Sequence, residues 1–148
     1  MRICTSLVVG LALLCTGAAA ARAPLPQADY IDRADSICHR FNPHFETRIK
    51  HLRNANDLHE YVQAVSELKE LSKDQYEQLQ RLPDPQTGLA ELNRYFTRYR
   101  KALQRLADVA DVARTGSRHA TGKAIHRFVK ASRAQLKAAQ KFGFTFCA

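Results

Sequence analysis

The fold is decided by residues 89–113, which read LAELNRYFTRYRKALQRLADVADVA. Apolar side chains recur there in alternating steps of three and four residues, at Leu89, Leu92, Phe96, Tyr99, Leu103, Leu106, Ala110 and Ala113. This heptad spacing draws one apolar stripe along a helix and is typical of left-handed helical bundles. Gly116 follows the stretch and is a suitable helix end. We therefore predict a helix over residues 87–114.

Three more amphipathic segments flank this one and predict helices over 27–53, 57–82 and 119–142. Pro43 falls inside the first, but the apolar stripe keeps its phase across it, so we expect a kink and no break. Asp57 and Glu60 form a D-x-x-E capping box at the start of the second. The fourth is expected to bury one apolar stripe: Ala124, Ile125, Phe128, Val129, Leu136, Ala139 and Phe142.

The four segments are joined by short connections, which favours an all-α, up-down-up-down four-helix bundle. The chain has 148 residues, of which 45% are hydrophobic and 25% charged. Those values are ordinary for a globular protein and fit one domain with one core.

The N-terminus has the pattern of a secretory signal. Arg2 precedes the apolar run 7–15, and small side chains follow it. We predict a signal peptide over 1–21, a mature helical domain over 22–148 with no transmembrane segment, and a secreted or periplasmic location. Lipid attachment at Cys15 is disfavoured, because Leu14 stands where a small residue is normally required.

Cysteine usage agrees with export. Removal of the signal leaves only Cys38 and Cys147, and neither belongs to a C-x-x-C motif. An isolated pair in an oxidising compartment is most simply a disulfide bond. In an up-down-up-down bundle the start of the first helix lies beside the end of the fourth, so the topology would bring the two cysteines together and close the bundle between the first helix and the C-terminal tail.

The two ends of the mature chain, YIDRADSICHRFN at 30–42 and FGFTFCA at 142–148, resemble a set of short exported bacterial proteins. Those proteins share an early A-D-x-I-C motif and a glycine or aromatic residue before a near-terminal cysteine, and some carry a lipid. The resemblance implies export, helices and a disulfide bond. It lends no catalytic residue, because most of these proteins have no assigned activity.

The tail itself, KFGFTFCA at 141–148, is interpreted as a structural closure. Gly143 can adopt the left-handed conformation that ends a helix. We expect Phe144 and Phe146 to cover the open end of the bundle and Cys147 to reach Cys38.

The sequence contains no recognisable motif for catalysis or metal binding. The serines stand in no recognisable nucleophile turn, no Glu-x-x-His pair is present, and we predict no catalytic residue, metal or cofactor. Asp32, Asp35 and His39 share one helix face, but that face is opposite the apolar stripe, so we interpret it as solvated. The sequence leans toward a non-enzymatic protein without deciding the point.

Charge is the strongest asymmetry in the chain, whose formal net charge is +9. Residues 24–84 contain eleven acidic and eight basic side chains, whereas 85–148 contain three acidic and thirteen basic ones. The basic side chains recur at helical spacing opposite the apolar stripes of the third and fourth helices. The candidate anion-binding residues are Arg94, Arg98, Lys101, Arg105, Lys123, Arg127, Lys130, Lys137 and Lys141.

Like charges at this spacing repel, so their repetition favours an anionic partner. This partner is either an acidic protein surface or a polyanion such as a cell-wall polymer, lipid headgroups or nucleic acid. Sequence-specific nucleic-acid recognition is not indicated, because the stripes lack interleaved aromatic residues. A merely solvated helix face is the competing interpretation. The alternative function is a small-molecule carrier that uses the bundle interior, lined by Tyr61, Phe96, Tyr99 and Phe128. The sequence does not indicate an oligomeric state.

Overall fold

A computed structural model describes residues 23–148, and the predicted signal peptide and Cys15 lie outside this part of the chain. Four helices account for most of it, and the prediction of an all-α bundle is confirmed. The helices are α1 (Gln27–Asn54), α2 (Leu58–Gln80), α3 (Leu89–Arg114) and α4 (Arg118–Phe142). Within 23–148 no strand forms, and one isolated bridge pairs Leu25 with Pro85.

Helix ends follow the signals in the sequence. Asp57 caps α2 by accepting a hydrogen bond from the Glu60 N–H at 2.8 Å, and the Glu60 carboxylate accepts one from the Asn56 N–H at 2.8 Å. Ser117 caps α4 by accepting from the Ala120 N–H. Gly143 ends α4 with φ of 108°, the left-handed conformation that lets the chain turn out of the helix.

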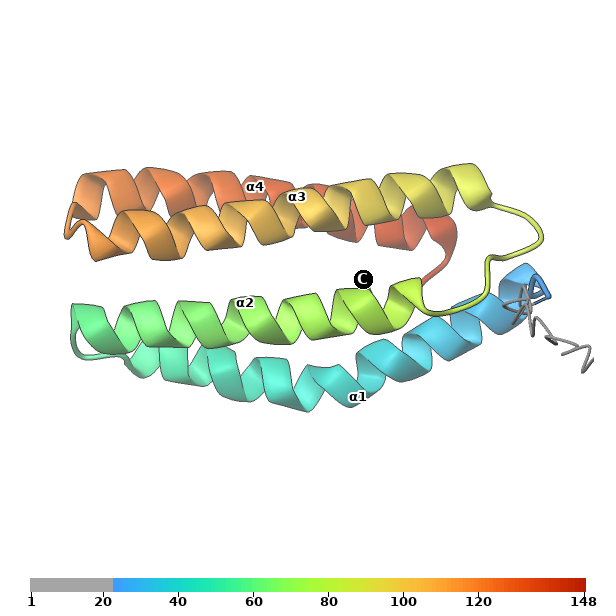
Figure 1. Cartoon of the computed structure of the whole chain (residues 1–148), viewed down its shortest axis with the longest axis horizontal. Helices are drawn as coiled ribbons and strands as arrows, with labels where there is room; N and C mark the ends of the chain where they lie inside the picture. Colours follow the sequence, from blue (N-terminus) through green and yellow to red (C-terminus); the bar gives the residue numbers. More distant parts are fainter. Residues whose placement is uncertain (1–22) are drawn as a thin grey trace, which may run out of the picture.

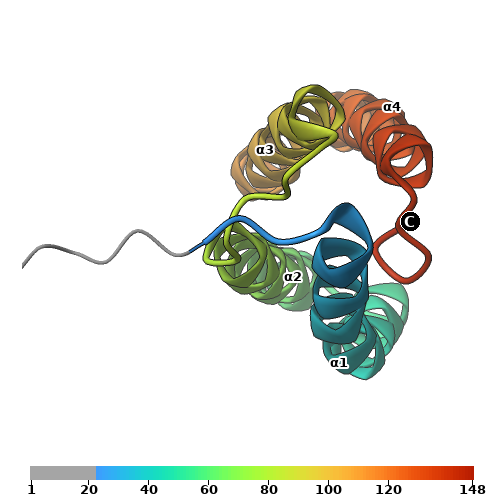
Figure 2. The same ribbon diagram turned by 90° about the vertical axis from the view of Figure 1, so that its right-hand side faces the viewer.

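The helices form two antiparallel pairs, with α1 and α2 facing α3 and α4 (Figure 1). Packing is closest between α3 and α4, and α2 contacts both α1 and α3. No Cα atom of α1 lies within 8 Å of one in α4, so this seam of the bundle is not closed by helix packing. Viewed along the bundle, the C-terminal tail lies between these two helices at one end (Figure 2).

The open seam corrects one expectation about α4. Ile125, Val129 and Leu136 were expected in the core but are 36%, 37% and 38% exposed. Periodicity placed them on the apolar side of the helix, and the side of α4 away from α3 has no neighbouring helix to cover it. Ala124, Ala139 and Phe142 of the predicted stripe are buried as expected, and Ala131 is buried with them. The three alanines are small, which allows α3 and α4 to approach closely.

Pro43 lies inside α1, and the helix continues through it as expected. Proline has no backbone N–H and therefore leaves one helical hydrogen bond unmade. The ribbon of α1 changes direction near its middle (Figure 1). The N-terminal part of α1 carries the buried residues that meet the tail, including Tyr30, Ala34 and Cys38.

Within residues 23–148, no helix combines the length and the apolar character needed to cross a membrane.

Candidate functional site

The C-terminal tail is bonded covalently to the first helix. Cys38 and Cys147, which are 109 positions apart in sequence, form a disulfide bond with their Cα atoms 5.2 Å apart, which confirms the predicted pairing. Both cysteines are buried. In the chain-entropy account, closing a loop of this length stabilises the folded state by about 4 to 5 kcal/mol.

Asp35 is the second attachment of the tail, and its placement corrects the expectation of a solvated face. It is only 8% exposed. Its Oδ2 accepts a hydrogen bond from the Thr145 N–H at 2.8 Å, and its Oδ1 accepts from the N–H groups of Phe146 and Cys147 at 2.9 and 3.2 Å. The interpretation was wrong for Asp35, because the tail folds back over it, which helical periodicity does not reveal. Asp32 and His39 are exposed, as expected.

The two tail phenylalanines behave differently from each other. Phe144 is buried and packs against Tyr95 and Phe142, with ring centroids 5.1 and 4.8 Å apart, so its predicted covering role is confirmed. Phe146 is 48% exposed and lies against the His39 ring at 4.9 Å, so the same prediction is wrong for it.

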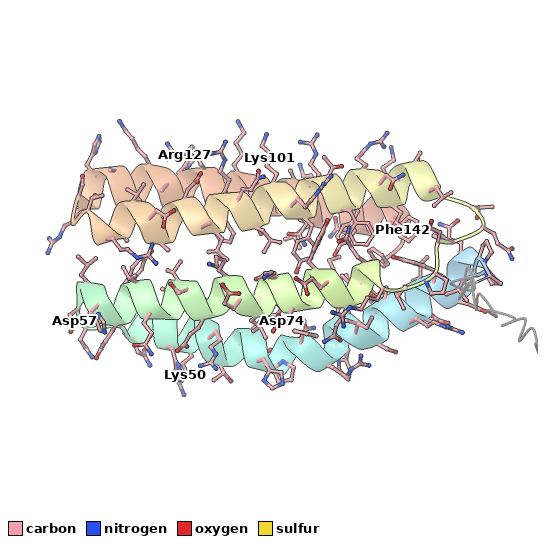
Figure 3. All side chains as sticks on the ribbon, viewed as in Figure 1. Lys50, Asp57, Asp74, Lys101, Arg127 and Phe142 are labelled. Atoms are coloured by element: carbon pink, nitrogen blue, oxygen red, sulfur yellow. A yellow bond between two sulfur atoms is a disulfide. The ribbon has the colours of Figure 1, made fainter. Side chains whose placement is uncertain are left out.

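Cationic side chains gather where α3 and α4 run side by side. Arg98, Lys101 and Arg105 from α3 line one shallow cleft together with Arg127 and Lys130 from α4. We name these five residues the α3–α4 cleft. Its volume is about 240 Å³, and the other lining side chains are alanines. Lys101 and Arg127 point away from the α1–α2 pair (Figure 3).

Few of these cations are neutralised. Arg105 forms an ion pair with Asp108 at 2.7 Å and is half-buried. Within residues 23–148 the other four members of the α3–α4 cleft have no carboxylate within 4.0 Å, and each is exposed. The cleft therefore carries several unpaired positive charges.

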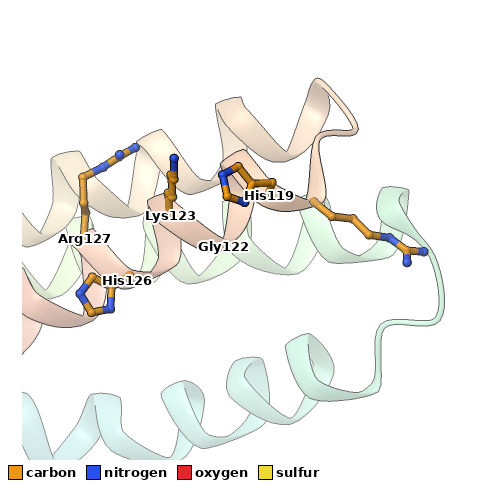
Figure 4. Close-up of a pocket in the computed structure, with 6 residues that line it drawn as sticks. His119, Gly122, Lys123, His126 and Arg127 are labelled. Carbon is orange, nitrogen blue, oxygen red and sulfur yellow. The ribbon is translucent and has the colours of Figure 1, made fainter.

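A second basic depression adjoins the cleft at the start of α4 (Figure 4). Its lining comprises Arg118, His119, Gly122, Lys123, His126 and Arg127. Lys123 and Arg127 extend to the same side of the helix, and Arg127 belongs to both depressions. The first turn of α4 contains no acidic residue, although carboxylates are the favourable groups at a helix N-terminus.

Three candidate residues stand outside both depressions. Arg94, Lys137 and Lys141 are exposed but line neither the α3–α4 cleft nor the depression at the start of α4. The structure therefore brings together six of the nine predicted residues. The other three, Arg94, Lys137 and Lys141, lie elsewhere on the same two helices.

A mainly apolar hollow, larger than the α3–α4 cleft, follows the open seam between α1 and α4. We name it the α1–α4 groove. Its volume is about 460 Å³, and side chains from all four helices and the tail line it. Tyr99 and Phe128, predicted for an interior cavity, are among them, whereas Tyr61 and Phe96 are not. The sequence offered no direct signal for the groove, because its existence depends on the distance between two helices.

Two buried tyrosines in and near the groove differ in hydrogen bonding: the Tyr99 hydroxyl has partners, whereas the Tyr95 hydroxyl has none of normal geometry within the described chain. The Tyr99 hydroxyl donates to Gln75 Oε1 at 2.7 Å and lies 3.0 Å from the Ser72 carbonyl oxygen. Burial of this ring raises the pKa of Tyr99. Nearby, Tyr95 is fully buried, and its hydroxyl makes no hydrogen bond of normal geometry within the described chain. Burial likewise raises the pKa of Tyr95, and the Gln135 side chain opposes that shift.

Metal binding has no candidate cluster within 23–148, where no three His, Cys, Asp or Glu side chains are placed to share an ion. Asp35, which shares a helix face with Asp32 and His39, already accepts hydrogen bonds from N–H groups of the tail with both carboxylate oxygens.

Comparison with known protein families, with curated proteins and with solved structures found no match to this chain.

Proposed function

We propose that this protein is an exported, non-enzymatic interaction module that binds a polyanion through the basic faces of α3 and α4. The observation that carries the proposal is the α3–α4 cleft, where five cations from two helices meet and only Arg105 has a carboxylate partner. Unpaired like charges held together repel one another, and a ligand with several negative charges removes that repulsion.

The chemistry of the cleft favours a sequence-independent contact. The lining side chains other than the cations are Ala131 and Ala134, so no aromatic ring is available for stacking on a base. The residues from Arg98 to Arg105 extend about 10 Å along the helix at 1.5 Å per residue. Repeating phosphate or carboxylate groups, as in cell-wall polymers, lipid headgroups or nucleic acids, suit such a row.

Export is supported by the disulfide bond and by the predicted signal peptide. Disulfide bonds persist mainly in oxidising compartments, where anionic polymers and membrane surfaces are accessible partners.

Heparin chromatography of the purified protein tests the proposal. Retention should fall steeply with salt, because neutralising phosphates or sulfates releases counterions. The triple substitution Lys123→Glu, Arg127→Glu and Lys130→Glu should abolish retention. The matched control reverses three exposed cations on α1, Arg40, Lys50 and Arg53, and thus changes the net charge equally.

The control variant should keep most of its retention. Equal loss in both variants would mean that net charge alone governs binding and that the basic face has no local role. Absence of retention by the unmodified protein at low salt would refute the proposal.

A further inference from the structure

We infer that the α1–α4 groove is a binding site for an uncharged, elongated apolar molecule with one hydrogen-bonding group, such as a long-chain alcohol or a similar neutral lipid. The groove opens between α1 and α4, whereas the cations of the proposed polyanion site gather between α3 and α4. The inference is therefore independent of the proposed function.

Apolar side chains are left exposed along this seam. Ile49 on α1, Leu136 on α4 and Phe146 in the tail all line the groove, and they are 37%, 38% and 48% exposed. Burying such side chains contributes about 25 cal/mol per Å² of apolar surface removed from water. A molecule that lies along the groove gains this contribution, because the two helices do not approach each other closely enough to cover these side chains themselves.

Charge decides the class of ligand. None of the side chains that line the groove is charged, although a quarter of the residues in the chain are. A carboxylate or ammonium group placed inside would lose its hydration without gaining an ion pair with a lining side chain, which is strongly unfavourable. The α3–α4 cleft shows the opposite chemistry, so the two sites select different molecules.

A few polar groups are available to orient a neutral ligand. Gln75 and Ser132 are among the residues that line the groove, and within the described chain the Gln75 amide nitrogen and the Ser132 hydroxyl make no hydrogen bond. Gln75 is held in place by Tyr99, whose hydroxyl donates to its Oε1. Small-molecule sites commonly combine an apolar lining with a small number of such groups.

The size of the groove also fits. Its volume of about 460 Å³ falls within the usual range for ligand sites, roughly 300 to 1,000 Å³. Along α1 the lining extends from Asn42 to Leu52, about 15 Å at 1.5 Å per residue. This length accommodates the hydrocarbon chain of dodecanol.

Competition binding tests the inference with the neutral fluorescent probe N-phenyl-1-naphthylamine and the exported, oxidised protein. Dodecanol should displace the probe at a concentration at least roughly tenfold lower than dodecanoate or dodecylammonium, a difference equivalent to about 1.4 kcal/mol. Equal displacement by all three molecules would contradict the assigned ligand class, and failure of the probe and dodecanol to bind would contradict the site.

Variants locate the binding. Ser132→Trp should fill the groove and Leu136→Arg should place a charge at its edge, and each should weaken probe binding at least roughly tenfold. Leu89→Arg is the matched control, because Leu89 is 43% exposed but does not line the groove. Circular dichroism checks that each variant is folded.

Light scattering distinguishes a ligand site from a self-interface. The inference is wrong if the protein is a dimer that does not bind the probe and that the substitution Leu136→Arg dissociates. In that case a second copy of the protein occupies the groove. A monomer that binds the probe supports it.

Discussion

The carboxylate of Asp35 in α1 accepts a hydrogen bond from the backbone N–H of Phe146 at 2.9 Å, although the two residues are 111 positions apart. The same carboxylate accepts from the N–H groups on either side, so one helical side chain fixes three successive residues of the tail. Hydrogen bonds to a charged acceptor are stronger than those between neutral groups. The disulfide bond therefore has a non-covalent neighbour that orients the same segment.

Asp35→Ala should lower the free energy of unfolding by about 2 to 4 kcal/mol, because three N–H groups lose a charged acceptor and one of them, in Cys147, is buried. Urea unfolding of the oxidised protein measures the loss. Asp32→Ala is the control, since Asp32 is exposed on the same helix. Equal stabilities of the two variants would show that the tail does not depend on the Asp35 carboxylate.

Removal of either disulfide cysteine should cost about 4 kcal/mol, since each single change opens the same covalent loop of 109 residues. Cys38→Ser and Cys147→Ser should therefore be equally destabilising, and the double variant should lose little more. Denaturant unfolding of all three, with the reduced unmodified protein as reference, checks this. Additive losses would contradict a shared bond as the cause.

Two glycines, Gly122 within α4 and Gly143 directly after it, should respond to alanine in opposite directions. Gly143 has φ of 108°, and an added Cβ would lie 3.1 Å from Ile31 Cδ1, so Gly143→Ala should destabilise by about 1 to 2 kcal/mol. Gly122 is helical with open space around it, and Gly122→Ala should stabilise by about 0.5 to 1 kcal/mol. Thermal unfolding measures both, and shifts of the same sign would contradict the assigned conformations.

Tyr95 and Tyr99 should differ when each loses its hydroxyl. Tyr95→Phe should change stability by less than about 0.5 kcal/mol or increase it, because the buried hydroxyl has no hydrogen bond of normal geometry to lose. Tyr99→Phe should destabilise by about 1 kcal/mol, because it leaves Gln75 Oε1 without its donor. Equilibrium urea unfolding at neutral pH separates the two, and a larger loss for Tyr95→Phe would overturn this assignment.

Alkaline pH should unfold the protein through its buried tyrosines. Burial raises the pKa of Tyr95 and Tyr99 above the usual value near 10, so above that pH the unfolded chain loses phenolic protons that the native state retains. Stability should be unaffected by these groups below about pH 10 and should fall above it by about 1.4 kcal/mol per pH unit for each tyrosine.

Urea unfolding between neutral pH and pH 11 measures how the free energy of unfolding depends on pH. Tyr95→Phe should lower this slope by the contribution of one tyrosine. Phenolate absorbance from Tyr95 in the protein while it is still native would contradict the burial that underlies the prediction.

Much of the fold follows from local sequence rules. The observed helix ends lie within two residues of the predicted ones, because Asp57, Ser117 and Gly143 are caps whose chemistry acts within one turn. The cysteine pairing was also predictable, since the antiparallel topology places Cys38 near the end of α4. The helix ends depend on neighbouring residues along the chain, and the cysteine pairing depends on the order of the helices.

The features that were missed depend on distances between elements. Asp35 faces away from the apolar stripe of its own helix, and only the returning tail explains its burial. Ile125 and Leu136 have the periodicity of core residues, but no helix lies close enough on their side of α4 to cover them. For the same reason the sequence predicted an interior cavity but not a groove along the α1–α4 seam, and of the predicted lining residues only Tyr99 and Phe128 line the groove. The cationic stripes of α3 and α4 could be identified by their spacing.

Because the disulfide bond joins Cys38 to Cys147, all three connections between helices lie inside one covalent ring. A protease that cuts any single connection of the oxidised protein opens this ring but releases no fragment. Exposed connections are the usual sites of such cuts. The nicked molecule therefore keeps its four helices in one covalent unit, and cleavage of a single connection does not separate them.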